Sequence, residues 1–156
     1  MTAETNAGFF VGWQCALMRD ILNRIIPPSG DFPGAGDLVV AEYIDGVVGR
    51  SAELKRLFSE GLVQIQIASQ AKYSREFSVL SDEQKDALLR YIESESAVFF
   101  QALVRYTYNG YYINPRIIQL VGLEVRPPQP HGYQVEPLDP SLLKKVKEMG
   151  RVYRPA

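Results

Sequence analysis

The segment from Ser81 to Gly110 constrains the fold most, because it joins a clear helix start to a long helical pattern. Ser81 and Gln84 have the spacing of a capping box, in which each side chain accepts a hydrogen bond from a backbone N–H group of the first turn. We predict one helix of about 27 residues, roughly 40 Å long, that is weakest at Ser94–Ser96 and ends at Gly110. Its apolar residues recur at three- and four-residue steps: Leu88, Tyr91, Ile92, Phe99, Leu103 and Tyr106.

The same reasoning predicts three helices before this segment. The first lies within 10–26 and ends at Pro27-Pro28, because proline lacks a backbone N–H group. The second begins near Asp37 and ends at Gly49, and the third begins at an N-cap on Ser51. Their apolar faces are Trp13, Leu17, Ile21 and Ile25 in the first, Val40, Ala41, Ile44, Val47 and Val48 in the second, and Leu54, Leu57, Phe58, Leu62 and Ile65 in the third. Gly61 in the third predicts a close helix crossing, since glycine in a helix otherwise costs roughly 1 kcal/mol.

Two short helices are predicted after Gly110. Asn114-Pro115 and Asp139-Pro140 each place a capping side chain before a proline in the first turn, and Gly122 ends the first of these helices. The segment 126–133 between them holds three prolines and is predicted to be extended. The expected fold is therefore all-α and a single domain over residues 1–156: a small irregular bundle of about four main helices from about 10 to 122, and a proline-rich tail with a short helix from about 123 to 156.

Composition excludes several classes of protein. A formal net charge of -1 argues against a nucleic-acid binder, and no apolar run approaches the ~18 residues of a membrane span. Cys15 is the single cysteine, which excludes an internal disulfide framework, and we expect it to be a small buried residue. The first six residues lack a basic region and a twin arginine. We therefore expect a cytoplasmic location, with a periplasmic location in an exported complex as the alternative.

The residues that could carry chemistry do not form a catalytic set. His131 is the single histidine and stands beside prolines, as loop residues do. Glu42 and Asp45 share a helix face, where such pairs are usually solvated. Gly34–Gly36 lacks the preceding strand and third glycine of a dinucleotide loop, so we expect a tight turn. The sequence therefore predicts no catalytic residue, no metal ligand and no cofactor-binding residue in this chain.

A run of tyrosines stands where the longest predicted helix ends. A tyrosine joins a large apolar ring to a polar hydroxyl, and it suits surfaces that become buried when a partner binds. Tyr106 continues the apolar stripe and is expected in the core. The other three, Tyr108, Tyr111 and Tyr112, either contact a partner or pack the tail onto the bundle. A further alternative is a free-standing sugar-binding module that uses these rings as a stacking platform.

Several segments, taken in order, resemble one known family. They are Ile25-Ile26-Pro27, Phe32-Pro33-Gly34-Ala35-Gly36, Tyr43-Ile44-Asp45, Phe77-Ser78-Val79-Leu80-Ser81, Phe99-Phe100, Gly110-Tyr111-Tyr112, Gly122 and Gly132-Tyr133. Their order and spacing, over roughly residues 10 to 135, make the chain similar to the gluconate 2-dehydrogenase subunit 3 family. Leu123 stands where the family often has a tyrosine.

The resemblance implies a small, non-catalytic accessory subunit of an oxidoreductase complex. It implies a large partner of the glucose-methanol-choline type that holds FAD, in some members with an iron–sulfur cluster, and that oxidises a sugar or sugar acid. It also implies a cytochrome as an electron acceptor in the wider complex. The resemblance favours partner contact over tail packing for the tyrosines. The expected partner-facing residues are Tyr108, Tyr111, Tyr112, Pro127, Pro128, Pro130, His131 and Tyr133.

Overall fold

The computed structural model describes residues 8–10, 12–123, 125 and 139–149 of the chain. It divides into two units, residues 1–125 and 126–156. The described residues contain helices and loops but no strand, and two residues, Ser29 and Phe32, form an isolated bridge. The prediction of an all-α fold is confirmed.

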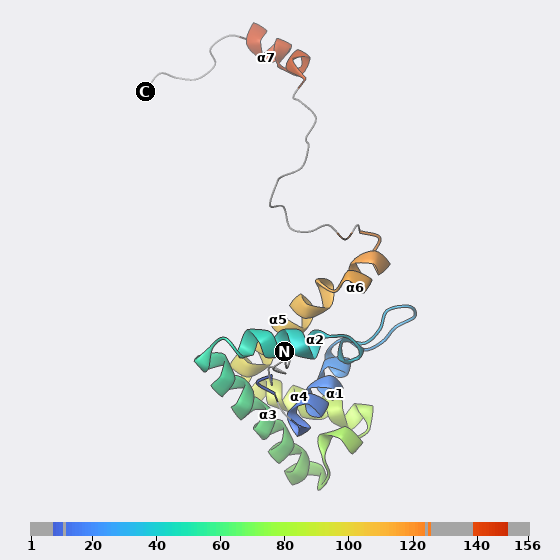
Figure 1. The fold of residues 1–156 in the computed structure, drawn as a ribbon, viewed down its shortest axis with the longest axis vertical. Helices are drawn as coiled ribbons and strands as arrows, with labels where there is room; N and C mark the ends of the chain where they lie inside the picture. Colours follow the sequence, from blue (N-terminus) through green and yellow to red (C-terminus); the bar gives the residue numbers. More distant parts are fainter. Residues whose placement is uncertain (1–7, 11, 124, 126–138, 150–156) are drawn as a thin grey trace, which may run out of the picture. The chain divides into compact units, whose positions relative to one another are not determined.

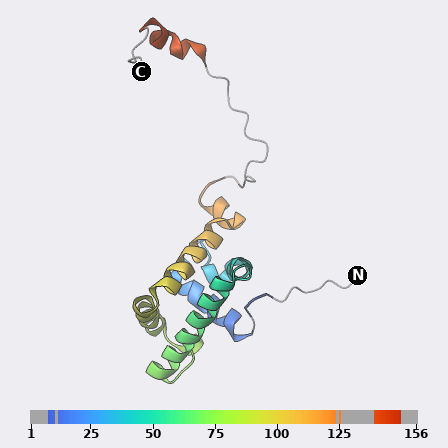
Figure 2. The ribbon, with the colours of Figure 1, turned by 90° about the vertical axis from the view of Figure 1, so that its left-hand side faces the viewer.

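The first unit is a helical bundle in which α5 packs against α2, α3 and α4 (Figures 1 and 2). Its elements are α1 (Trp13–Ile25), the 3-10 helix η1 (Ala35–Asp37), α2 (Val40–Val48), α3 (Ala52–Tyr73), the 3-10 helix η2 (Phe77–Val79), α4 (Asp82–Glu95), α5 (Ala97–Tyr112) and α6 (Pro115–Leu120). The described part of the second unit consists of the 3-10 helix η3 (Pro140–Leu143) and α7 (Lys144–Glu148).

The helix starts that the sequence predicts from capping residues are confirmed. The Ser81 hydroxyl accepts a hydrogen bond from the Gln84 N–H at 3.3 Å, and the Gln84 side chain accepts one from the Ser81 N–H at 3.0 Å. Ser51 caps α3, with 3.3 Å between its Oγ and the Leu54 nitrogen. Asn114 caps α6 and Asp139 caps η3. These caps are local, so the sequence is sufficient to place them.

The predicted long helix is in fact two helices, α4 and α5, which meet at Ser96. The Ser96 backbone leaves the helical region at φ −136°, and its hydroxyl donates a hydrogen bond to the side chain of Gln64 in α3. The bond crosses 32 residues of sequence. The break therefore lies at the predicted weak point, and a contact with another helix accompanies it.

Gly110 does not end the helix, which continues to Tyr112. A Cβ atom at Gly110 would lie 2.7 Å from Cδ1 of Tyr43 and 3.0 Å from Cγ1 of Val40, both in α2. This glycine therefore allows α5 to pack closely on α2. The helix ends at Tyr112 instead, two residues before Asn114-Pro115, where the proline disfavours a helical conformation for Asn114.

The first two helices also differ from the sequence-based boundaries. Asp37 belongs to η1, and α2 begins at Val40. The side-chain oxygen of Asn23 accepts a hydrogen bond from the Gly36 N–H at 2.7 Å, which holds this turn against α1. Trp13, expected on the buried face of α1, is 47% exposed. The face of α1 that is buried consists of Leu17, Met18, Ile21 and Leu22.

Aromatic rings form the centre of the core. Phe58 in α3 is fully buried, and its ring lies 5.4 Å from the ring of Phe99 in an edge-on arrangement. The rings of Phe10 and Tyr106 lie 6.1 and 6.3 Å from it. Tyr106 is half-buried and packs against the core. Since these residues come from α3, α5 and the segment before α1, Phe58 joins parts that are distant in sequence.

Replacing Gly61 with alanine is expected to destabilise the bundle by about 1–3 kcal/mol, because overpacking a filled site strains its neighbours. A Cβ atom there would overlap ring carbons of Phe99, which confirms the predicted close crossing. Gly46 in α2 is the matched control, since nothing lies within 4 Å of the position that a Cβ atom would take there. Gly46→Ala should stabilise by about 0.5–1 kcal/mol. Urea unfolding of both variants tests this, and a stabilising Gly61→Ala would contradict the crossing.

Candidate partner interface

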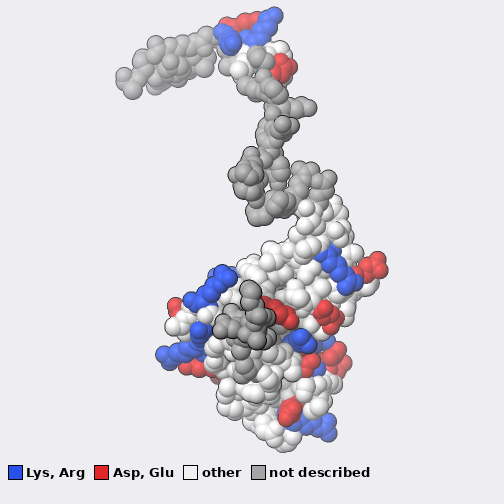
Figure 3. Space-filling model, viewed as in Figure 1, with Lys and Arg blue, Asp and Glu red and all other residues white. Residues whose placement is uncertain are grey.

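Exposed apolar side chains gather at the C-terminal end of the bundle. Among them Tyr112 is 54% and Leu123 64% exposed. The end of α5 and all of α6 project from the other helices in both ribbon views (Figures 1 and 2). This part of the molecule is largely free of charge on the face drawn in Figure 3. We call it the α5–α6 surface and define it as Tyr108, Tyr112, Ile113, Leu120, Val121, Leu123 and Val125.

Two tyrosines form the aromatic part of the α5–α6 surface. Tyr108 and Tyr112 are one turn apart on α5, and residues four positions apart lie on the same face of a helix. Their ring centroids are 6.1 Å apart with an interplanar angle of 22°, so the rings are stacked. The structure thus exposes both rings, as expected. Because the rings already restrain each other, each would lose less conformational entropy when a partner binds.

The position of the aliphatic residues depends on how the C-terminal end of α6 is capped. Ile117 is fully buried and anchors α6 to the bundle. Gly122 adopts φ +80°, and the Leu123 N–H then donates a hydrogen bond to the Ile118 carbonyl at 3.0 Å. The Gly122 N–H donates to the Gln119 carbonyl at 2.9 Å, which completes a Schellman motif. The predicted stop at Gly122 is confirmed, and it places Leu123 beside α6.

Tyr111 does not belong to this exposed surface. It is 3% exposed, and its hydroxyl donates a hydrogen bond to the Pro33 carbonyl at 2.9 Å, across 78 residues of sequence. Burial raises the pKa of the Tyr111 phenol, so the hydroxyl remains protonated as a donor. Its ring meets the Tyr112 ring edge-on at 5.3 Å. The expectation that Tyr111 faces a partner is therefore wrong; this residue supports Tyr112 from within the fold.

A small groove lies beside Tyr108. It has a volume of about 330 Å³, and its lining includes Leu89, Phe100 and Val104. Three charged residues line this groove, and two of them, Arg24 and Asp86, are paired with each other while Arg90 is the third. Arg24 donates to both carboxylate oxygens of Asp86, at 2.7 and 2.9 Å, and these hydrogen bonds lower the pKa of the Asp86 carboxyl. The Arg24–Asp86 pair thus ties α1 to α4 and is engaged in structure.

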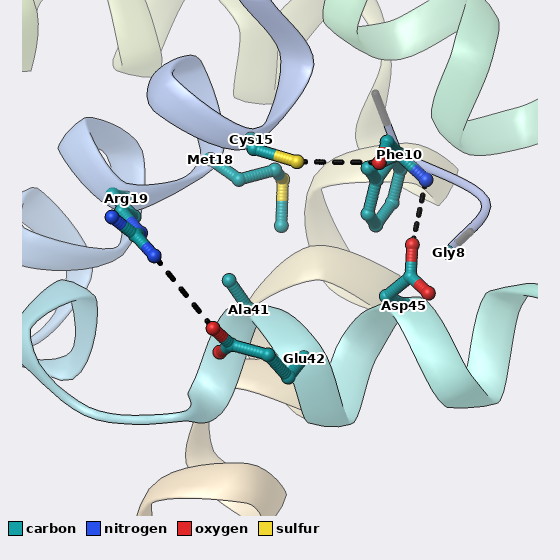
Figure 4. Close-up of a pocket in the computed structure, with 8 residues that line it drawn as sticks. All are labelled: Gly8, Phe10, Cys15, Met18, Arg19, Ala41, Glu42 and Asp45. Carbon is teal, nitrogen blue, oxygen red and sulfur yellow. Dashed lines mark hydrogen bonds and ion pairs between the residues drawn. The ribbon is translucent and has the colours of Figure 1, made fainter. Parts of the chain in front are cut away.

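A second cavity, of about 380 Å³, lies between α1 and α2 (Figure 4). Asp45 accepts a hydrogen bond from the Phe10 N–H at 2.6 Å, and the Cys15 thiol donates to the Phe10 carbonyl at 3.2 Å. Both sequence-based expectations fail here. Asp45 holds the segment before α1 rather than being merely solvated, and Cys15 is exposed rather than buried. Glu42 instead forms an exposed ion pair with Arg19, with 3.7 Å between its Oε1 and the Arg19 Nη2.

The described residues show no arrangement of groups suited to a metal ion. No group of three or more histidine, cysteine or carboxylate side chains comes together among them. No helix in the described ranges is long and apolar enough to cross a membrane. Some of the expected partner-facing residues lie outside the described residues: Pro127, Pro128, Pro130, His131 and Tyr133.

Sequence reasoning missed the aliphatic half of the α5–α6 surface. A signal for it was present, because the segment 117–125 has six apolar residues while its helix is too short to bury them all. Of the described residues in this segment only Ile117 is buried, whereas Leu120, Val121, Leu123 and Val125 are exposed.

Comparison with curated proteins and with solved structures found no match. The model of the family described as gluconate 2-dehydrogenase subunit 3 matches residues 13–124, which contain α1 to α6 and nearly all of the α5–α6 surface. The match covers well over half of the chain, and the chain therefore belongs to the gluconate 2-dehydrogenase subunit 3 family.

Proposed function

We propose that this chain is a non-catalytic accessory subunit that binds and stabilises a large FAD-dependent dehydrogenase of the glucose-methanol-choline type. The α5–α6 surface is the observation that carries the proposal. Its tyrosines are of a type enriched at the centre of protein interfaces, and contiguous exposed apolar patches mark interaction sites. Membership in a family of dehydrogenase subunits supports a subunit of such a complex as the partner.

The chemistry is assigned to the partner. In this proposal FAD, and any iron–sulfur cluster, belongs to the large subunit, which oxidises a sugar or sugar acid and passes electrons to a cytochrome. The small subunit contributes binding free energy. A partner that binds only the folded form of the large subunit stabilises that form by mass action, by about 2.7 kcal/mol at a hundredfold excess over Kd.

Co-expression with a large flavoprotein dehydrogenase encoded next to this chain tests the proposal. We expect the two proteins to co-purify, and we expect the large protein to be less soluble or less active when produced alone. Equal solubility and activity of the large protein alone, together with no co-purification, would refute the proposal.

Removing residues 126–156 is expected to change the stability of the bundle by less than about 1 kcal/mol. The buried core residues of the described chain all lie between Phe10 and Ile117, and residues 126–156 form a separate unit. We also expect the truncated chain to bind the large subunit more weakly, because the removed segment includes Pro127, Pro128 and Tyr133. Thermal unfolding and a pull-down measure the two effects. An unfolded truncation product would show that the tail completes the core.

A sugar-binding module is the second candidate, favoured by the stacked rings of Tyr108 and Tyr112 beside a groove that both apolar and charged side chains line. It predicts that the chain alone binds a sugar and that Tyr108→Ala abolishes this binding. Calorimetric titration against a panel of sugars decides it: heat that disappears in Tyr108→Ala would support this module, and the absence of heat with every sugar would exclude it.

A further inference from the structure

One charged side chain, that of Arg116, lies in α6 among the described residues from Tyr108 to Val125. Between Thr107 and Leu123 the sequence holds a single charge, that of Arg116. Arg116 is exposed in the first turn of α6, and Leu120, also exposed, lies one turn later on the same face. No ion pair joins Arg116 to a carboxylate in the part of the chain that the structure describes. Among the described residues of this segment, the guanidinium is thus a cation without an ion-pair partner, next to exposed apolar side chains.

A partner protein that covers the α5–α6 surface would also remove the Arg116 guanidinium from water. An arginine keeps its charge at any physiological pH, and taking it out of water is unfavourable unless it is paired and hydrogen-bonded. The surrounding residues of α6 offer an amide, Gln119, and aliphatic side chains but no carboxylate. A protein that buries this surface must therefore supply the acceptor itself. A carboxylate is the acceptor whose geometry matches the guanidinium, because two parallel hydrogen bonds can form.

We propose that Arg116 is the orienting charge of the interface and pairs with an aspartate or glutamate beside an apolar groove of the large dehydrogenase subunit. The inference rests on the proposed function, of which it specifies the partner surface. Because α6 projects from the bundle, the partner surface is a concave groove that receives α6 (Figure 2). Apolar contacts supply most of the affinity, and the single charge pair selects one orientation of α6 in the groove.

Three variants of the full-length chain, measured against the large subunit, test the role of Arg116. Arg116→Glu places two like charges together and should weaken binding at least about 30-fold. Arg116→Lys keeps a point charge but loses the bidentate geometry, so its loss should be smaller. Arg116→Met keeps much of the apolar stem and removes the charge, and it should reduce the dependence of the association rate on salt concentration.

Arg56 in α3 offers a matched control for the charge change. It is 81% exposed and pairs with Glu60 on the same helix. Arg56→Glu alters the net charge as Arg116→Glu does, and we expect it to bind as the wild type does. Arg116→Met removes the charge without introducing a negative one, so it separates loss of the charge pair from any disturbance that a new glutamate causes. Thermal unfolding of every variant without the partner should match the wild type.

The possible outcomes separate the two proposals. If the wild-type chain does not bind the large subunit, the proposed function fails. If the wild type binds and Arg116→Glu binds equally well with the same salt dependence, only the role of Arg116 is refuted. If Arg116→Glu fails to bind, replacing acidic residues of the large subunit one at a time with arginine should identify the carboxylate, as the change that restores binding.

Discussion

Replacing Phe58 with alanine is expected to lower the free energy of unfolding by about 3–5 kcal/mol, as large-to-small changes of buried aromatic residues do. The Phe58 ring is fully buried and lies near three other rings, that of Phe10 before α1 and those of Phe99 and Tyr106 in α5. Its removal leaves a cavity where α3 and α5 meet, and close-packed neighbours fill such a cavity incompletely. The loss is a large fraction of the 5–15 kcal/mol that stabilises a typical domain.

Urea unfolding followed by circular dichroism measures the effect of Phe58→Ala. Val63 supplies the control, since it lies in the same helix and is 42% exposed. Val63→Ala should change the unfolding free energy by less than about 0.5 kcal/mol, as surface changes usually do. A loss below about 1 kcal/mol for Phe58→Ala would show that the aromatic cluster is not the centre of the core.

Replacing Tyr112 with alanine is expected to weaken binding to the large subunit by ~2 kcal/mol or more, which is about 30-fold. The Tyr112 ring is 54% exposed, stacks on Tyr108 and rests edge-on against the buried Tyr111. A ring held in this way already has the position it would need in the complex, so it loses little conformational entropy on binding. The stability of the isolated bundle should change by less than about 0.5 kcal/mol.

Tyr91 supplies the control for the Tyr112 substitution. It is 47% exposed in α4 and borders a different groove, together with Ile67 and Leu88. Tyr91→Ala removes a ring of similar exposure from outside the α5–α6 surface and should leave the affinity unchanged. Surface plasmon resonance with the immobilised large subunit gives both values. Equal losses for the two variants would show that the α5–α6 surface has no special part in binding.

Much of the helical architecture could be predicted from local sequence. The capping box of Ser81, the cap at Ser51 and the Asn114-Pro115 start of α6 each involve residues within one turn of each other, so no other part of the chain is needed to form them. The spacing of apolar residues also identified much of the buried face of α3. In α4 it placed Leu88 and Ile92 correctly, but Tyr91, expected on the same stripe, is 47% exposed, and Leu89 is buried instead. The stacking of Tyr108 and Tyr112 has the same local origin, because residues four positions apart share a helix face whatever packs elsewhere; their contact with a partner stays a prediction.

What the sequence could not provide depends on contacts between distant residues. Ser96 separates α4 from α5 and bonds to Gln64, 32 positions earlier. Gly110 carries the usual signal of a helix end, yet α2 packs against it and the helix continues. Tyr111 and Tyr112 are adjacent and identical in type, but one donates a hydrogen bond to Pro33 in the core while the other is exposed.

The sequence alone therefore determined the helical class, the helix starts that carry a capping side chain, and the aromatic character of the end of α5. The tertiary structure decided which of the tyrosines is exposed, that aliphatic residues at α6 extend the same surface, and that Arg116 has no ion-pair partner among the described residues. The physical reason is the range of the interactions. Caps and helical periodicity act within a few residues, whereas burial is decided by which helix, distant in sequence, covers a given face.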